Sequence, residues 1–431
     1  MKNKSVDIIT LGCSKNLVDS EMLIKQFEAA GFCVEHDSPN PKGKIVVINT
    51  CGFIGDAKEE SIDTILNFAE ARKRGGIHKL FVMGCLSERY FNQLGDEIPE
   101  VDRFYGKFNW KELITDLGYG YRTDLKNERT LTTPGHFAYL KISEGCNRTC
   151  SYCAIPIITG KHKSRTVESL VDETKSLANK GVKELQIIAQ DLSYYGVDNY
   201  KKKSLARLID TLSKIDGIEW LRLHYTYPAQ FPMDVIDIMA ENPKVCNYLD
   251  MALQHISDPI LKAMRRKITN DETYRLINDI RSKVPGIHLR TTLITGYTNE
   301  TEEDFNKLVR FVEETRFERL GVFPYSHEED TYAWKHQKDN IPDEIKQERA
   351  DIIMELQSNI SRELNEQKVG ASLKVIIDRK EGDYYVGRSE YDSPEVDPEV
   401  LVKSAKSMKI GNFYNVKITE VEDYDLLGVI Y

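Results

Sequence analysis

Cysteines are the residues of this chain that are best placed to do chemistry, and six of the eight fall into two groups of three. The tight group, Cys146, Cys150 and Cys153, lies within eight residues of one stretch. Three thiolates so spaced can hold three irons of a cubane iron-sulfur cluster and leave the fourth iron free to bind a substrate. The alternative is a zinc site, which prefers four ligands and would have to recruit His162 or Cys246.

The wide group consists of Cys13, Cys51 and Cys85, each of which directly follows a short apolar run and has a glycine neighbour. Parallel strands end at one edge of a sheet. Cys51 and Cys85, which follow Cys13 by 38 and 72 residues, can therefore meet it at that edge. Glycine lets the backbone approach a bulky cluster closely. This pattern predicts a second metal site, and the alternative is three buried cysteines that act as small apolar residues.

The sequence around the wide group shows the pattern of strands and helices in alternation. Expected strands at 6–11, 45–49 and 79–84 are followed by expected helices through 21–30, 56–73 and 87–94. Such alternation predicts a parallel sheet with crossover helices.

The middle of the chain repeats the same pattern six times, and the tight group follows the first strand. The expected strands are 137–143, 184–189, 219–224, 248–253, 287–294 and 318–323. Six units predict a partial barrel, with its active centre at the C-terminal ends of the strands.

A long polar helix at 343–366 precedes strands expected at 372–379, 384–389, 413–421 and 425–431. The expected fold class is therefore α/β, with an N-terminal parallel-sheet domain (1–134), a central partial (β/α)6 barrel plus connecting helix (135–366) and a small C-terminal antiparallel β-barrel (367–431).

The composition of the chain limits the classes of function that we expect for it. The 431 residues carry a net charge of -9, which argues against bulk attraction to nucleic acid. No stretch resembles a signal peptide or a membrane helix, so we expect a cytoplasmic protein without membrane contact. Short basic runs such as 265–267 are expected to be solvated faces.

The loop SEGCNRTCSYCAIP (143–156) resembles the CxxxCxxC loop of radical S-adenosylmethionine enzymes. The resemblance implies that Cys146, Cys150 and Cys153 hold a 4Fe-4S cluster whose open iron binds S-adenosylmethionine. It also places Tyr152 near the adenine of that cofactor.

Further residues are candidates for contact with S-adenosylmethionine because of their chemistry or their place in the sequence. They are Arg165, whose planar fork suits a carboxylate, and the polar residues after two barrel strands, Gln190, Asp191 and Gln254. No catalytic residue beyond the cluster ligands is expected.

The whole chain resembles the methylthiotransferases, which carry a second 4Fe-4S cluster on N-terminal cysteines, here Cys13, Cys51 and Cys85, and end in a TRAM domain. One branch, RimO-type, modifies an aspartate β-carbon of small-subunit ribosomal protein S-twelve, and the other, MiaB-type, modifies a tRNA adenosine. The segments LGCSKNLVDSE (11–21) and NTCGFIGDAKEES (49–61) are more similar to the first branch.

Charge favours the same branch. Residues 369–431 contain eight basic and twelve acidic residues, a net charge of -4 that suits a basic ribosomal protein better than phosphate. The alternative is that these acids only aid solubility. The resemblance further implies a low-potential electron donor and a sulfur donor as partners, with tRNA as the less favoured substrate. A non-catalytic iron-sulfur carrier is the rival from another class.

Overall fold

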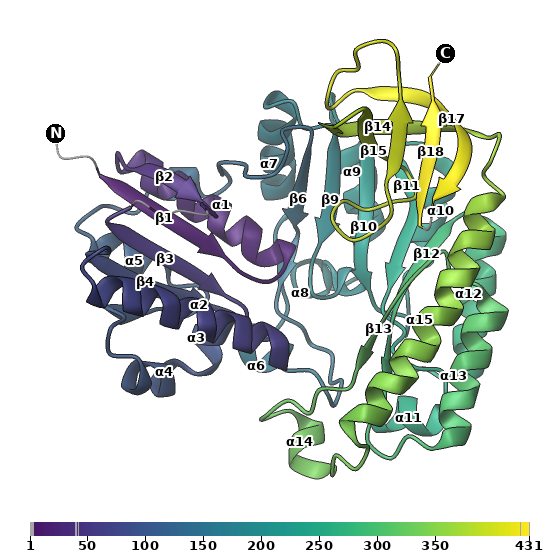
Figure 1. Cartoon of the computed structure of the whole chain (residues 1–431), viewed down its shortest axis with the longest axis horizontal. Coiled ribbons are helices and arrows are strands. Elements are labelled where there is room, and N and C mark those ends of the chain that lie inside the picture. Colours follow the sequence, from purple (N-terminus) through teal and green to yellow (C-terminus); the bar gives the residue numbers. More distant parts are fainter. Residues whose placement is uncertain (1–3, 39–40, 42, 423, 431) are drawn as a thin grey trace.

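The computed structural model describes residues 4–38, 41, 43–422 and 424–430. Its three regions follow one another along the chain, from the purple N-terminal sheet through the teal and green barrel to the yellow C-terminal barrel (Figure 1). The sequence-based domain boundaries fall between elements, in the segments 126–136 and 367–371, and the exact limits stay a prediction. The expected final strand reaches Tyr431, which lies outside the described residues.

The N-terminal region is built on a five-stranded sheet in the order β2-β1-β3-β4-β5, with every pair parallel. The strands are β1 (Ser5–Thr10), β2 (Cys33–His36), β3 (Ile45–Thr50), β4 (Lys79–Gly84) and β5 (Arg103–Phe104). The three expected strands are confirmed as β1, β3 and β4, whose residues are mostly buried. The two edge strands were not expected because they are short and half-exposed.

Helices cover both faces of this sheet, as expected for a parallel sheet. They are α1 (Ser14–Ala29), α2 (Gly55–Lys73), α3 (Cys85–Arg89), α4 (Phe91–Glu97), α5 (Trp110–Asp116) and the 3-10 turn η1 (Thr123–Leu125). One apolar core contains Leu23, Phe27 and Leu113, and the other contains Ile65 and Leu94. The sheet is thereby fixed between two layers, and its strand ends are held in register.

The central region is an open parallel sheet of six strands in the order β13-β12-β11-β10-β9-β6, which confirms the partial barrel. The strands are β6 (Phe137–Lys141), β9 (Glu184–Ile188), β10 (Trp220–Thr226), β11 (Val245–Met251), β12 (His288–Thr295) and β13 (Arg319–Pro324). A two-stranded pair, β7 (Ser143–Glu144) and β8 (Lys163–Ser164), flanks the loop that carries the tight group.

Helices cover the outer face of the barrel. The elements are α6 (Ile155–Thr159), α7 (Val167–Asn179), η2 (Leu192–Tyr194), α8 (Val197–Tyr200), α9 (Leu205–Ser213), α10 (Asp234–Glu241), α11 (Asp258–Ala263), α12 (Asn270–Lys283), α13 (Glu302–Thr315), α14 (Tyr332–His336) and α15 (Asp343–Glu366). Helices α12 and α13 begin with capping boxes at Thr269 and Thr301, which satisfy the first free amides. The bounds of α15 confirm the expected helix at 343–366.

The C-terminal region is a closed five-stranded barrel in the order β14-β15-β16-β18-β17. Its strands are β14 (Ser372–Glu381), β15 (Tyr384–Ser389), β16 (Val400–Lys403), β17 (Phe413–Glu422) and β18 (Asp425–Val429). Four strands were expected, and the short β16 was not. The pair β16–β18 is parallel, so the barrel is antiparallel at its other four pairs only.

Buried charges join this C-terminal barrel to the N-terminal ends of the central strands. Glu184, at the start of β9, lies 2.9 Å from the Arg222 guanidinium and 2.8 Å from that of Arg388. Asp392 pairs with Arg319 at 2.5 Å, and Tyr248 donates to Asp397 at 2.8 Å. The C-terminal barrel therefore closes the end of the central barrel that lies opposite the cysteine loops. Among the helices of the described residues, none is long and apolar enough to cross a membrane.

Candidate active site

The wide group lies at the C-terminal edge of the N-terminal sheet. Cys13 directly precedes α1 as its N-cap, Cys51 follows β3, and Cys85 opens α3. Strands β1, β3 and β4 are neighbours, so the three loops come together. A side chain at Gly12, whose φ is +90°, would place its Cβ 2.7 Å from the Cβ of Cys51. The loops are thus packed so closely that only glycine fits beside Cys51.

Positive charge surrounds the wide group. Burial alone would raise the pKa of the Cys13 thiol, but the ammonium groups of Lys15 and Lys107 and two backbone amides of α1 outweigh it and lower that pKa. For Cys85 burial dominates and raises the pKa to about 11, although Lys107 Nζ lies 3.6 Å from its Sγ. Cations and helix amides stabilise thiolates, the form in which cysteine binds metal.

The tight group lies on the loop between β7 and α6, after the first barrel strand. Gly145, with φ +76°, allows this loop to turn, because a Cβ there would lie 2.2 Å from the carbonyl oxygen of Lys161. The amide of Ser151 donates to the Met264 carbonyl at 3.0 Å, and the amide of Arg148 donates to Cys146 Sγ at 3.4 Å. Backbone contacts therefore hold the loop at the C-terminal mouth of the barrel.

In the tight group, burial raises the thiol pKa values as it does for Cys85. It raises the pKa of Cys146 to about 11 and raises that of Cys153 further. The cation beside this group is Arg266, 2% exposed, whose Nη1 lies 3.5 Å from Cys150 Sγ and 3.3 Å from the Tyr152 hydroxyl. Its Nε has no hydrogen-bond partner among the described residues.

Arg266 corrects the expectation that the run 265–267 is a solvated face. Its neighbours Arg265 and Lys267 are exposed and have φ of +59° and +54°. This left-handed turn directs the middle residue inward while the flanking ones stay in water. A charged run by itself does not reveal such a turn, so the sequence offered no signal for it.

Tyr152 and Gln190, two of the predicted cofactor residues, contact groups beside the tight group. Tyr152 accepts from Arg266, and its ring meets Tyr297 edge to face at 6.5 Å. Gln190 donates to Glu144, two residues before Cys146, while its buried Oε1 has no partner among the described residues. Their contact with a cofactor stays a prediction.

Of the other predicted cofactor residues, Asp191 and Arg165 form ion pairs with neighbouring side chains, whereas Gln254 does not. Asp191 lies 2.7 Å from Arg148 and caps η2 through Ser193. Arg165 lies 2.5 Å from Glu173 and also donates to Lys141, so its fork is engaged away from the cysteines. Gln254, three residues beyond the end of β11, has a left-handed φ of +75°, and no hydrogen bond of its side chain occurs within the described residues.

The donor sets favour clusters over a single metal ion. Within the described ranges, no three His, Cys, Asp or Glu side chains are arranged to hold one metal ion. Cys246 is buried with Trp220 near the start of β11, at the end of the barrel away from the tight group, and His162 contacts Ser164 at 3.0 Å. Cys246 is therefore placed away from the tight group, whereas the buried Nδ1 of His162 has no hydrogen-bond partner among the described residues. Each thiol of a cubane binds a different iron, which suits three cysteines on one loop.

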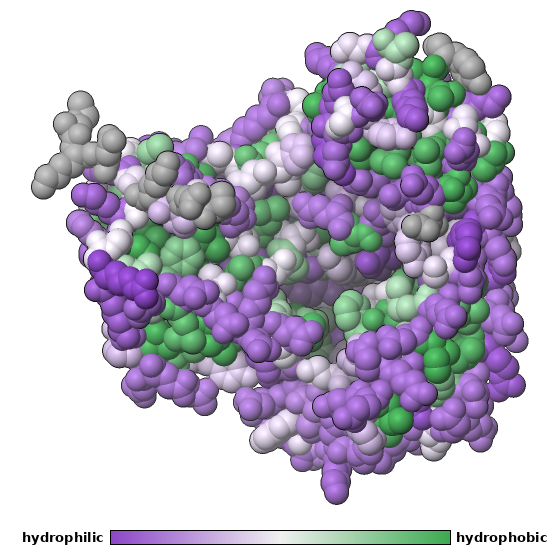
Figure 2. All heavy atoms as spheres, viewed as in Figure 1, coloured by the Kyte–Doolittle hydropathy of each residue, from purple (hydrophilic) through white to green (hydrophobic). Residues whose placement is uncertain are grey.

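Ion pairs join the N-terminal region to the central barrel on the side that carries the two cysteine groups. Glu328, from the segment after β13, lies 2.8 Å from Lys58 and 2.8 Å from Arg89 of the N-terminal region. Lys141 of β6 bridges Asp19 of α1 and Glu144. Figure 2 shows a hollow between the N-terminal sheet and the barrel, at the centre of this face.

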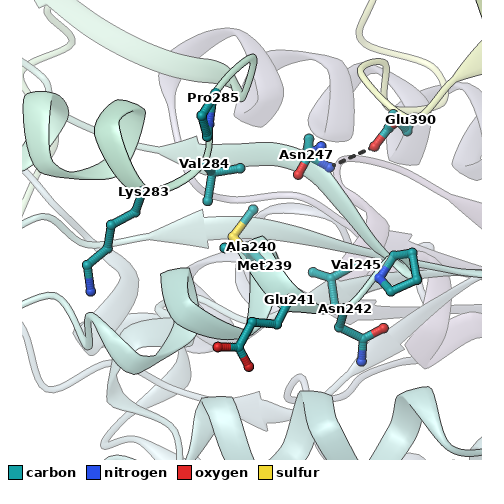
Figure 3. A pocket seen from close by; sticks show the side chains of 11 residues that line it. Met239, Ala240, Glu241, Asn242, Val245, Asn247, Lys283, Val284, Pro285 and Glu390 are labelled. Carbon is teal, nitrogen blue, oxygen red and sulfur yellow. Dashed lines mark hydrogen bonds between the residues drawn. The ribbon is translucent and has the colours of Figure 1, made fainter.

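Two measured cavities lie elsewhere. The first, of about 350 Å³, is lined by the end of α10, the loops around Val245 and Pro285, and Glu390 (Figure 3). The second, of about 370 Å³, lies between α15, β12 and the C-terminal barrel. Both lie toward the N-terminal ends of the strands, so neither belongs to the mouth that carries the cysteines.

Comparison with known proteins finds relatives that match the chain over its whole length. Family models match residues 5–106 (uncharacterized protein family UPF0004), 140–312 (radical SAM superfamily) and 369–430 (TRAM domain). Curated proteins named ribosomal protein uS12 methylthiotransferase RimO are 60% identical in Bacteroides thetaiotaomicron, over 100% of this chain and 99% of that protein, and 58% identical in Parabacteroides distasonis, over 100% of both.

Solved structures share the fold. The radical S-adenosylmethionine methyltransferase TsrM from Kitasatospora setae, with tryptophan and a SAM analog bound, superposes with a TM-score of 0.55 at 15% identity, covering 88% of this chain and 79% of that one. The cobalamin-dependent radical enzyme OxsB superposes with a TM-score of 0.54 at 12% identity, covering 82% of this chain and 56% of that one. At such identity the likeness concerns the fold alone.

Proposed function

This chain belongs to the family of ribosomal protein uS12 methylthiotransferases, and we propose that it transfers a methylthio group to the β-carbon of an aspartate in uS12, the protein called S-twelve above. The enzyme is a radical SAM transferase that uses S-adenosylmethionine and 4Fe-4S clusters. The observation that carries the proposal is the presence of two three-cysteine sets, each at the C-terminal ends of strands in regions joined by ion pairs, within a full-length relationship to these enzymes.

The cysteines divide the work between two clusters in this proposal. Cys146, Cys150 and Cys153 hold the one that binds S-adenosylmethionine, and Cys13, Cys51 and Cys85 hold the one that carries sulfur. When bound, these groups supply a methyl group, a sulfur atom and a radical that removes hydrogen from a carbon too weakly acidic for base chemistry. General acid-base groups contribute little to such a step.

The side chains of the protein position the reactants and keep water out. Arg266, buried beside Cys150, faces the cofactor side with donors that suit a carboxylate. The Glu328 ion pairs with Lys58 and Arg89 hold the two cysteine sets at a fixed separation. Such fixed alignment of reacting groups is the main contribution that a protein scaffold makes to this kind of reaction.

The net charge of the C-terminal barrel contributes less to this choice of substrate than the sequence suggested. Of its acids, Asp378 pairs with Arg388, Asp392 with Arg319, and Asp397 with Arg290, all at the junction with the central barrel. Asp423 lies outside the described residues. Of the exposed acids, Glu381 pairs with Arg379 and Glu395 accepts from the Tyr139 hydroxyl. Asp383, Glu420 and Glu422 have no side-chain partner among the described residues and remain available to a basic partner. The tRNA alternative is disfavoured by the curated relatives, whose names specify uS12.

A low-potential electron donor, a sulfur donor and a cytoplasmic location complete the proposal. The electron donor is required because the cluster must be reduced before each turnover. The sulfur donor is required because the transferred sulfur is consumed. A ribosomal protein substrate is available in the compartment where ribosomes assemble.

Mass spectrometry of uS12 and of tRNA from a deletion strain tests the proposal. Loss of a methylthio group from one uS12 aspartate, restored by the plasmid-borne gene, is the expected result. Loss from a tRNA adenosine with unchanged uS12 would assign the chain to the other branch. Absence of S-adenosylmethionine binding by calorimetry after anaerobic reconstitution would instead support a non-catalytic carrier.

A further inference from the structure

Most cations around the mouth of the barrel have a carboxylate partner. Lys107 lies 3.4 Å from Asp19, and Lys141 contacts both Asp19 and Glu144. Arg148 lies 2.7 Å from Asp191. Arg266 has no carboxylate partner but is enclosed by Cys150, Tyr152 and the Ala252 carbonyl, on the side of the tight group.

Lys15 differs from all of these. Its half-buried ammonium has neither a hydrogen bond nor an ion pair with any residue that the structure describes. It lies instead 3.5 Å from the centroid of the Tyr225 ring, on the other side of the interface between α1 and the barrel. A cation over an aromatic face is held only weakly and keeps its donors free for an anion.

The position of Lys15 is between the two cysteine groups. It is two residues beyond Cys13 in the first turn of α1, and the Cys13 thiol and the Glu144 carboxylate both act electrostatically on its ammonium. Glu144 is in turn two residues before Cys146. A substrate carbon that meets both cysteine groups must therefore pass close to this cation.

Tyr225 is held in place under strain. It lies near the C-terminal end of β10 with φ +61°, a left-handed conformation that is costly for a bulky residue. The Asp250 carboxylate accepts from its backbone amide at 3.1 Å, and Leu17 of α1 belongs to the same apolar cluster as its ring. Strain of this kind is stored where a side chain must be presented in one orientation.

We propose that Lys15 is the specificity-determining residue that binds the side-chain carboxylate of the substrate aspartate. The inference rests on the proposed function. In an aspartate the β-carbon is bonded directly to the carboxyl carbon, so a cation that fixes the carboxylate also fixes the carbon that reacts. Lys15 leaves the Tyr225 ring, forms a charge-assisted hydrogen bond to the carboxylate and so selects aspartate over asparagine.

A different role for Lys15 would be to offset negative charge on a cluster held by Cys13. Lys107 already provides a cation at 3.6 Å from Cys85 and lowers the pKa of Cys13 together with Lys15. The two roles differ in what they change: a charge-balancing lysine affects the cluster, and a substrate-binding lysine affects discrimination between substrates.

The experiment compares the reconstituted enzyme with Lys15→Met, Lys15→Arg and the matched control Lys25→Met. Lys25 lies on the same helix and, among the described residues, pairs with Glu28 alone, at 3.9 Å. Binding to recombinant uS12 is measured by fluorescence anisotropy, with the target aspartate present or replaced by asparagine. Iron content and the electron paramagnetic resonance spectrum of the clusters are recorded for each variant.

The wild-type enzyme and Lys25→Met should bind the aspartate form about tenfold more tightly than the asparagine form, as expected for one charge-assisted hydrogen bond. Lys15→Met should lose this preference while keeping its iron and spectrum, and Lys15→Arg should retain part of it. A preference that survives in Lys15→Met overturns the inference. Loss of iron or a changed spectrum in that variant also overturns it, in favour of the charge-balancing role. If the wild-type enzyme does not modify uS12 at all, the proposed function itself fails.

Discussion

The two ends of the central barrel differ in how completely their buried and half-buried cations are paired with carboxylates. At the end closed by the C-terminal barrel, Glu184 meets two guanidinium groups and Asp392 meets another, so buried charges are paired. At the mouth, Lys15 has no anionic partner within the described residues, and Arg266 faces a thiol rather than a carboxylate. The closed end is built for stability, whereas the mouth keeps binding capacity free.

This contrast follows the general division of labour in parallel βα barrels. Their C-terminal strand ends carry chemistry, and their N-terminal ends carry stability. Real proteins leave local interactions unsatisfied at functional sites and compensate for the cost elsewhere. The unpaired cations are therefore better indicators of function than the two measured cavities, which both lie toward the closed end.

The largest expected effect comes from the thiols at the mouth. Cys150→Ala should abolish formation of deoxyadenosine and lower the iron content from about eight to about four per chain, because one of two cubanes is lost. Cys51→Ala should lower the iron content equally but retain deoxyadenosine formation. Iron analysis and chromatography of the nucleoside measure both, and deoxyadenosine formed by Cys150→Ala would contradict the division between the groups.

At the closed end, Glu184→Gln should lower the free energy of unfolding by about 3–5 kcal/mol, because it leaves Arg222 as a buried charge without its counter-ion and Arg388 with Asp378 alone. Urea denaturation measures the change. The control is Glu219→Gln, which breaks an exposed pair with Lys374 at the same junction and should cost about 1 kcal/mol or less. Equal losses in the two variants would remove the basis for calling this end the stabilising one.

Beside the tight group, Arg266→Met should weaken S-adenosylmethionine binding about tenfold, because it removes a buried charged donor that suits a carboxylate. Calorimetry on the reconstituted enzyme gives the affinity. Arg265→Met is the matched control, since this exposed neighbour only covers the Tyr332 ring at 4.4 Å. An unchanged affinity in Arg266→Met would show that this cation serves the loop and not the cofactor.

The smallest effect concerns pH at the closed end. Burial, opposed by Asp392, lowers the pKa of Lys368 from 10.5 to about 8 in the folded chain. Between these values the unfolded chain binds more protons, so the free energy of unfolding should rise as the pH is raised from about 8 to about 10.5. Lys368→Met should flatten this rise by on the order of 1 kcal/mol in urea titrations. A slope that persists in the variant would assign it to other groups.

Local patterns predicted most elements of this protein correctly. Buried apolar runs marked β1, β3 and β4 and all six barrel strands, and polar periodicity marked α15. Prediction failed at the short strands β2, β5 and β16, which have too few apolar residues to stand out. Cys33, which belongs to neither cysteine group, is exposed on the edge strand β2.

The sequence by itself determined the cysteine groups, the order of strands and helices, and thereby the edge of the sheet where Cys13, Cys51 and Cys85 lie. Only the tertiary structure decided which charges are paired. Arg266 points inward because two left-handed residues flank it, and Asp392 and Asp397 of the C-terminal barrel are engaged by arginines 73 and 107 residues away in the sequence. Periodicity reports local burial, whereas pairing depends on groups that are distant in the sequence, and so the lack of an anionic partner for Lys15 among the described residues became visible only in the folded chain.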